Sequence, residues 1–77
     1  MLIKEIVYDY MSKIEDKKIK RKLDQQNGIL CDETEEIFKK LFGLYSGLLQ
    51  ENEIIAVKYV INYCIESYLN ERGLANV

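Results

Sequence analysis

The stretch from Asn52 to Arg72 decides the fold, and it reads NEIIAVKYVINYCIESYLNER in one-letter code. Apolar residues recur in it at spacings of three and four, the period of an α-helix with one buried face. We therefore predict a helix over about 53–72. Its broad apolar face is formed by Ile54, Val57, Val60, Ile61, Cys64, Ile65 and Tyr68. The only polar strip on this helix, formed by Asn62, Glu66 and Asn70, is narrow.

An earlier segment, about 2–26, also has helical periodicity. Its first half carries six apolar residues on one face, namely Ile3, Ile6, Val7, Tyr10, Met11 and Ile14. Ile19 and Leu23 would point to the opposite side of a straight helix, and lysines would then face the core at a high desolvation cost. We therefore predict a kink or a break near Glu15–Lys18.

The segment between these two, about 33–50, is the third predicted helix. Its apolar arc is formed by Ile37, Phe38, Leu41, Phe42, Leu44, Tyr45, Leu48 and Leu49. Gly43 and Gly47 lie on the opposite face, where each costs about 1 kcal/mol relative to Ala in a helix interior. Either another backbone approaches closely at these glycines, or the helix simply tolerates them.

Glycines predict where two of the helices end. Asn27-Gly28 is a typical C-terminal stop for the first segment, because Gly adopts the left-handed conformation that follows many helices. Gly73 is expected to do the same for the last helix. Leu74 would then pack back onto Leu69.

Polar residues predict where two helices begin. Asp32 is the expected N-cap of the second segment, with Glu35 completing a capping box. Glu33 and Glu36 complement the positive end of the helix dipole, so we interpret this acidic cluster mainly as capping rather than as a cation site. Asn52 is the expected N-cap of the last helix.

These elements predict an all-α fold. A chain of 77 residues has the size of one domain, and short links favour antiparallel neighbours. We expect a single helical domain over 1–77, a small antiparallel three-helix bundle. A break in segment 2–26 would give four helical pieces.

The composition offers little for catalysis or metal binding. The chain has no His and two cysteines, Cys31 and Cys64, too few for a structural zinc site. We interpret them as reduced thiols, with a disulfide as the alternative in an oxidising compartment. No Ser or Cys has a recognisable base, and no Gly-rich loop precedes a helix with Lys. We therefore expect no enzyme, no cofactor and no metal.

The start of the sequence, MLIKEIVYDYMSK, does not resemble a signal peptide. Glu5 and Asp9 lie where the apolar region of a signal peptide would be. Lys58 and Glu66 interrupt the longest apolar stretch, so we expect no membrane-spanning segment. We predict a cytoplasmic location, in a bacterial cell or an infected host cell.

Charge is segregated along a chain whose net charge is −2. Most of the charged residues in 24–53 are acidic, whereas the N-terminal part contains a dense basic run: Lys17, Lys18, Lys20, Arg21 and Lys22. We favour a solvated helix end for this run. The alternatives are contact with an acidic protein surface, with an anionic membrane or with nucleic-acid phosphates. No helix-turn-helix pattern accompanies the run, and Ile19 and Leu23 alone offer little apolar surface to a membrane.

Two tyrosines on the flank of the last helix are the best candidates for contact with another protein. Tyr59 and Tyr63 lie one turn apart, next to Ile55 and Ala56. Tyrosine is an effective interface residue because it joins a large apolar ring to a hydroxyl. The alternative is that both rings are partly buried at the edge of the core.

We therefore expect a small non-enzymatic module that binds another protein, as a stoichiometric inhibitor or an adaptor. In size and helical character the chain is similar to small proteins of bacterial mobile elements, such as phage-encoded anti-CRISPR inhibitors and bacteriocin immunity proteins. This likeness rests on no motif and implies a protein partner only. The alternatives are a nucleic-acid-associated regulator that uses the basic run, or a structural homodimer joined through the last helix.

Overall fold

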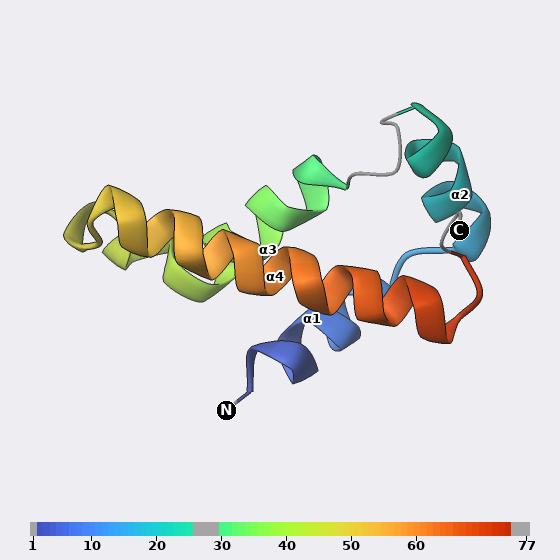
Figure 1. Cartoon of the computed structure of the whole chain (residues 1–77), viewed down its shortest axis with the longest axis horizontal. Helices are drawn as coiled ribbons and strands as arrows, with labels where there is room; N and C mark the ends of the chain where they lie inside the picture. Colours follow the sequence, from blue (N-terminus) through green and yellow to red (C-terminus); the bar gives the residue numbers. More distant parts are fainter. Residues whose placement is uncertain (1, 26–29, 75–77) are drawn as a thin grey trace.

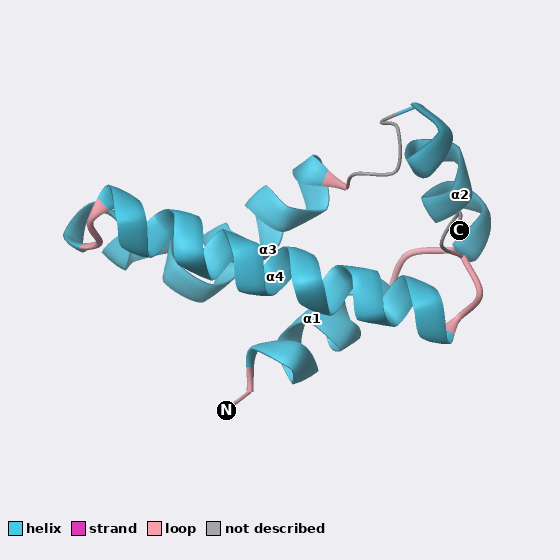
Figure 2. Ribbon diagram, viewed as in Figure 1, coloured by secondary structure: helices cyan, strands magenta, loops and turns pink. Residues whose placement is uncertain are grey.

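A computed structural model describes residues 2–25 and 30–74 of the chain, with only the backbone at 44–46. Its helices are α1 (Ile3–Ser12), α2 (Asp16–Gln25), α3 (Cys31–Phe42), the 3₁₀ helix η1 (Gly43–Leu48) and α4 (Glu51–Glu71) (Figure 1). The described parts contain no strand (Figure 2). The all-α class is confirmed, and the described residues form four α-helices, the number expected if segment 2–26 breaks.

Helix α4 is the longest element, and the rest of the molecule is arranged along it. It packs against both α1 and α3, while α2 lies near its C-terminal end (Figure 1). Its buried residues are Ile61, Cys64, Ile65, Tyr68 and Leu69. The expectation that Val60 faces the core is wrong, because its side chain is 46% exposed on a flank that neither α1 nor α3 covers.

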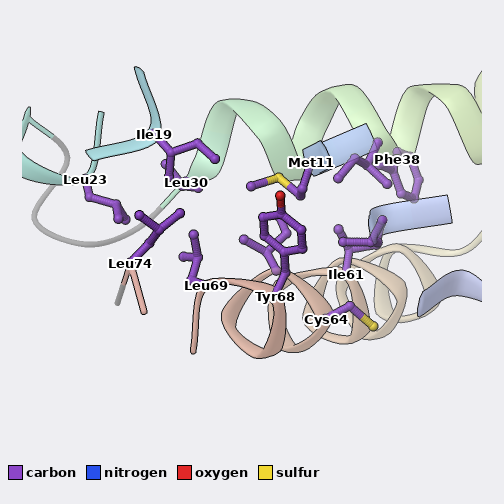
Figure 3. Packing of buried hydrophobic residues seen from close by; sticks show 13 residues of the cluster. Met11, Ile19, Leu23, Leu30, Phe38, Ile61, Cys64, Tyr68, Leu69 and Leu74 are labelled. Atoms are coloured by element: carbon purple, nitrogen blue, oxygen red, sulfur yellow. The ribbon is translucent and has the colours of Figure 1, made fainter. Parts of the chain in front are cut away.

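The hydrophobic core receives residues from all four α-helices. Val7 and Met11 of α1 and Ile37 of α3 are fully buried. Figure 3 shows a second group at one end of the cluster, where Ile19, Leu23, Leu30, Leu69 and Leu74 gather. The prediction that Leu48 belongs to the core is wrong: it lies in η1, beyond the packed part of α3, and is 79% exposed.

The predicted break in the first segment is confirmed, although it lies slightly earlier than expected. Residues 13–15 separate α1 from α2. The change of direction turns Ile19 and Leu23 toward the core, where they are 1% and 4% exposed. The lysines of α2 are thereby kept out of the core, which removes the desolvation cost of a straight helix.

The predicted N-cap of α3 is wrong. The helix begins at Cys31 and its N-cap is Leu30, which makes no side-chain capping bond. Asp32 therefore lies in the first turn, where its charge still complements the helix dipole. Leu30 is 4% exposed, so packing of this leucine, rather than a polar cap, fixes the start of the helix.

The predicted N-cap of α4 is also wrong, by two residues. Gln50 occupies this position, and its backbone N–H donates to Oε1 of Glu53 at 3.0 Å. Asn52 lies inside the first turn, where its Oδ1 accepts from the backbone N–H of Glu53 at 3.0 Å. The acidic residue three positions after the N-cap thus sets the boundary, as in a capping box.

The predicted end of α4 is confirmed. Gly73 has a φ of 69°, in the left-handed region. Its N–H donates to the carbonyl of Asn70 at 3.1 Å, and the N–H of Leu74 donates to that of Leu69 at 2.8 Å. This is the Schellman arrangement, with Leu74 buried against the core as its apolar contact. The predicted stop at Asn27-Gly28 lies outside the described residues.

Close backbone approach does not explain the two glycines of segment 33–50. A Cβ placed on Gly43 or Gly47 would meet no atom of the described residues within 4 Å. The α-helix instead ends at Phe42 and continues as η1. The remaining explanation is that the chain tolerates both glycines without any packing role for them.

We expect opposite effects from alanine at two of these glycines. Gly73→Ala should lower the free energy of unfolding by about 1–2 kcal/mol, because a Cβ disfavours the left-handed conformation. Gly43→Ala should raise it by about 0.5–1 kcal/mol, because Ala restricts the unfolded chain and the site has room for a methyl group. Urea denaturation of both variants checks this pair, and equal effects would contradict it.

Three partly or fully buried groups make the stability sensitive to alkaline pH. Burial raises the pKa of the Cys64 thiol. Burial also raises the pKa of the Tyr8 hydroxyl, with the Glu71 carboxylate as a further cause. The pKa of Tyr10 is raised by burial and by the carboxylates of Glu33 and Glu36.

We expect the free energy of unfolding to fall as pH rises. Each of these groups holds its proton more tightly in the folded chain, so the unfolded chain releases protons first. The loss should begin near the ordinary thiol pKa of 9.0 and steepen above the ordinary tyrosine pKa of 10.0. Urea denaturation at neutral pH, at pH 9.0 and at pH 10.0 measures this loss of stability. Cys64→Ala should remove the first part of the loss, and a flat or rising profile would contradict the assignment.

Candidate functional site

The side of α4 that faces away from α1 and α3 carries an exposed apolar surface. Ile55, Tyr59 and Tyr63 are 57%, 76% and 71% exposed, Ala56 is exposed, and Val60 lies beside them. We call these five residues the α4 outer face. The structure thus brings together the four residues that the sequence suggested, and adds Val60. They share one surface because their positions along α4 are opposite those of Ile61 and its buried neighbours.

The tyrosines whose side chains the structure describes separate into two groups. Tyr8 and Tyr68 pack edge to face with ring centroids 5.3 Å apart, and Tyr10 lies under the ammonium of Lys40. All three rings lie in the core or at its edge. Tyr59 and Tyr63 make no hydrogen bond, ion pair or ring contact within residues 2–25 and 30–74, so they are available to a partner.

An open pocket of about 350 Å³ lies beside the two exposed tyrosines. It is lined by Leu30, Tyr59, Asn62, Tyr63, Ile65, Glu66 and Leu69. Leu30, Ile65 and Leu69 are buried core residues. The pocket therefore joins an apolar lining to the aromatic residues of the α4 outer face.

Two polar residues in the pocket lining differ in their partners. Asn62 accepts a hydrogen bond from the hydroxyl of Thr34, a buried residue of α3, so this side chain ties α3 to α4. Glu66 is exposed and forms no ion pair among the described residues. The sequence showed both as members of the polar strip of α4. The sequence did not indicate that Leu30, the N-cap residue of α3, lines the same pocket as Asn62 and Glu66.

Four of the five residues of the basic run lie on the outer side of α2. Lys17, Lys18, Lys20 and Arg21 are exposed and form no ion pair within the part of the chain that the structure describes. We call them the α2 basic face. The helix that carries this face, α2, lies near the C-terminal end of α4 (Figure 1), and its buried residues Ile19 and Leu23 hold it in place.

Lys22, the fifth residue of the run, has a different environment. Its Nζ lies 2.5 Å from Oε2 of Glu33, whose side chain is 4% exposed. This hydrogen bond raises the pKa of Lys22. Glu35 of the same acidic cluster pairs with Lys58 at 2.7 Å. Ion pairs between helices therefore engage two members of the cluster that we interpreted as capping.

We expect Lys22→Met to lower the free energy of unfolding by about 1–3 kcal/mol, because it leaves the buried Glu33 carboxylate without its cation. The double variant with Glu33→Gln should recover part of this loss. Lys20→Met, on the α2 basic face, is the matched control and should change stability by no more than about 0.5 kcal/mol. Urea denaturation provides the comparison. A Lys22→Met chain as stable as the control would contradict a role for this pair.

The remaining chemistry-bearing residues do not converge. Among the described residues, no group of three or more His, Cys, Asp or Glu side chains could hold a metal ion. Both cysteines are free thiols, with Cys31 exposed and Cys64 buried. In the same part of the chain, no helix has the length and apolar character needed to cross a membrane.

Comparison of the chain with protein-family models, with curated proteins and with solved structures found no match. The candidate functional surfaces of this chain are therefore the α4 outer face, the pocket beside it and the α2 basic face.

Proposed function

We propose that this chain is a non-enzymatic protein-binding module that holds another protein through the α4 outer face, as a stoichiometric inhibitor or adaptor. The observation that carries the proposal is the exposure of Tyr59 and Tyr63, at 76% and 71%, on a helix that otherwise supplies much of the core. Contiguous exposed apolar surface on a small protein marks an interaction site more often than isolated apolar residues do.

The composition of this surface supports a protein partner over a small molecule. Aromatic residues are enriched in protein interfaces, and tyrosine is among the residues that most often dominate their binding energy. Ile55 and Val60 extend the apolar area on either side of the tyrosines, so the surface is elongated along the helix. A protein surface can cover such a shape.

The α2 basic face would have a supporting part in this function. Four cations that form no ion pair with other described residues create a positive field at one end of a chain whose net charge is −2. Such a field increases the association rate and orients an acidic region of the partner. We place this function in the cytoplasm of a bacterial or infected host cell.

The second candidate is a nucleic-acid-associated regulator, and the exposure of the same four cations favours it. Phosphate binding by Lys17, Lys18, Lys20 and Arg21 would need no contribution from α4. We place it second because it leaves the exposed tyrosines without a role.

We expect Tyr59→Ala combined with Tyr63→Ala to abolish partner capture while the fold survives. Each tyrosine should cost about 2 kcal/mol or more of binding free energy if it is a main contributor, which weakens the complex at least about thirtyfold. The measurement is affinity capture from the native host or the infected cell, with quantitative mass spectrometry. Circular dichroism should show unchanged helix content, because both side chains are exposed.

The matched control is Leu48→Ala, which removes a side chain that is 79% exposed and belongs to η1 rather than to the α4 outer face. It should retain the partner. The proposal fails if the double tyrosine variant captures the same partner as the wild type. It also fails if the captured molecule is DNA or RNA, whose binding weakens steeply with salt and is lost in Lys18→Glu, Lys20→Glu and Arg21→Glu.

A further inference from the structure

We infer that the partner presents a basic amphipathic segment, with an apolar side chain that enters the pocket beside α4 and an Arg or Lys that pairs with Glu66. This inference rests on the proposed protein-binding function and states the chemistry of the partner. It follows from the pocket lining, from the charge of the exposed side of α4 and from the position of the two tyrosines.

The pocket lining combines two kinds of chemistry. Leu30, Ile65 and Leu69 are at most 4% exposed and offer an apolar surface. Glu66 contributes a carboxylate to the same lining. An apolar side chain of the partner fits the first group, while the carboxylate requires a cation, because covering a charge without a counter-charge is unfavourable.

The cations of α4 are already engaged elsewhere. Lys58 pairs with Glu35 at 2.7 Å and lies over the ring of Phe38, on the α3 side of the helix. Arg72 pairs with Asp16 of α2 at 3.0 Å. Lys58 is the one Lys or Arg within α4, and Arg72 is the C-cap residue that follows it. The carboxylate of Glu66 is therefore left without a cation among the described residues.

The tyrosines strengthen the preference for a cation at this position. Tyr59 and Tyr63 both line the pocket that Glu66 lines. The faces of aromatic rings attract guanidinium and ammonium groups, and arginine is enriched in protein interfaces. A cation placed beside Glu66 would thus meet a carboxylate and an aromatic ring together, which favours Arg over Lys.

A second copy of this chain fits the surface less well. Two α4 helices that meet in parallel would bring the two Glu66 carboxylates together. Two that meet antiparallel about Tyr59 would bring Glu66 near Glu51 and Glu53 at the start of the other helix. Like charges across an interface are unfavourable, so the charge pattern favours a different protein that presents a basic segment to α4 over self-association.

The test uses random dodecapeptides displayed on phage and selected on the immobilised full chain. Enriched peptides should carry an Arg or Lys within one helical turn of a Leu, Met, Phe or Trp. Synthetic versions of the strongest binders are then titrated by fluorescence anisotropy. Glu66→Lys should weaken them at least about tenfold, because it replaces attraction by repulsion. Lys and Glu have similar helix propensities, so the variant should remain folded.

Glu36→Lys is the matched control, since it makes the same charge change at an exposed position of α3, away from the pocket lining. It should bind the selected peptides as the wild type does. The tyrosine double variant should lose them. Loss in both the Glu66 and tyrosine variants, with the control intact, supports the inference.

Other outcomes overturn it in distinguishable ways. Peptides that need the tyrosines but bind Glu66→Lys equally well, or that show no excess of basic residues, refute the charge inference and leave the proposed function standing. Peptides that depend on neither the tyrosines nor Glu66, or a selection without binders, count against both. A dimer in sedimentation velocity that the tyrosine variant abolishes identifies a second copy as the occupant and overturns the inference.

Discussion

Burial of one face of α4 is the interaction on which the rest of the structure depends. Ile61, Ile65 and Leu69 are nearly inaccessible because α1 and α3 both pack against this single helix. A small bundle has few elements with which to cover a helix of 21 residues. Two neighbours cover one side of α4 and leave the other side to solvent. The same constraint therefore produces the core and the α4 outer face.

The cost of burying charged side chains determines how α2 is oriented against the core. A helix uninterrupted from α1 into α2 would have turned lysines toward the core, and the break at residues 13–15 avoids this. After the break, Ile19 and Leu23 enter the core. Lys22 reaches the buried carboxylate of Glu33, and Arg72, at the end of α4, pairs with Asp16. These contacts hold α2 so that its remaining cations point outward as one basic face.

The candidate site arises where two elements distant in sequence meet. α4 supplies the tyrosines, the carboxylate of Glu66 and most of the pocket lining, whereas Leu30 comes from the residue that precedes α3. The hydrogen bond from Thr34 to Asn62 holds these elements together beside the pocket. Because this support lies in packed helices, the aromatic residues are presented on a rigid surface, which lowers the entropy lost when a partner binds.

The sequence by itself determined the helical class, the break before α2, the Schellman end at Gly73 and four of the five residues of the α4 outer face, all but Val60. Each of these follows from local rules, namely helical periodicity, the desolvation cost of lysine and the freedom of glycine at positive φ. Only the tertiary structure decided which tyrosines are buried, which lysine pairs with Glu33 and that Leu30 lies in the pocket lining. It also overruled Asp32 as a cap, because the buried Leu30 occupies the N-cap position of α3. These features depend on which helices become neighbours, and that choice is made by the summed packing of many side chains rather than by any local pattern.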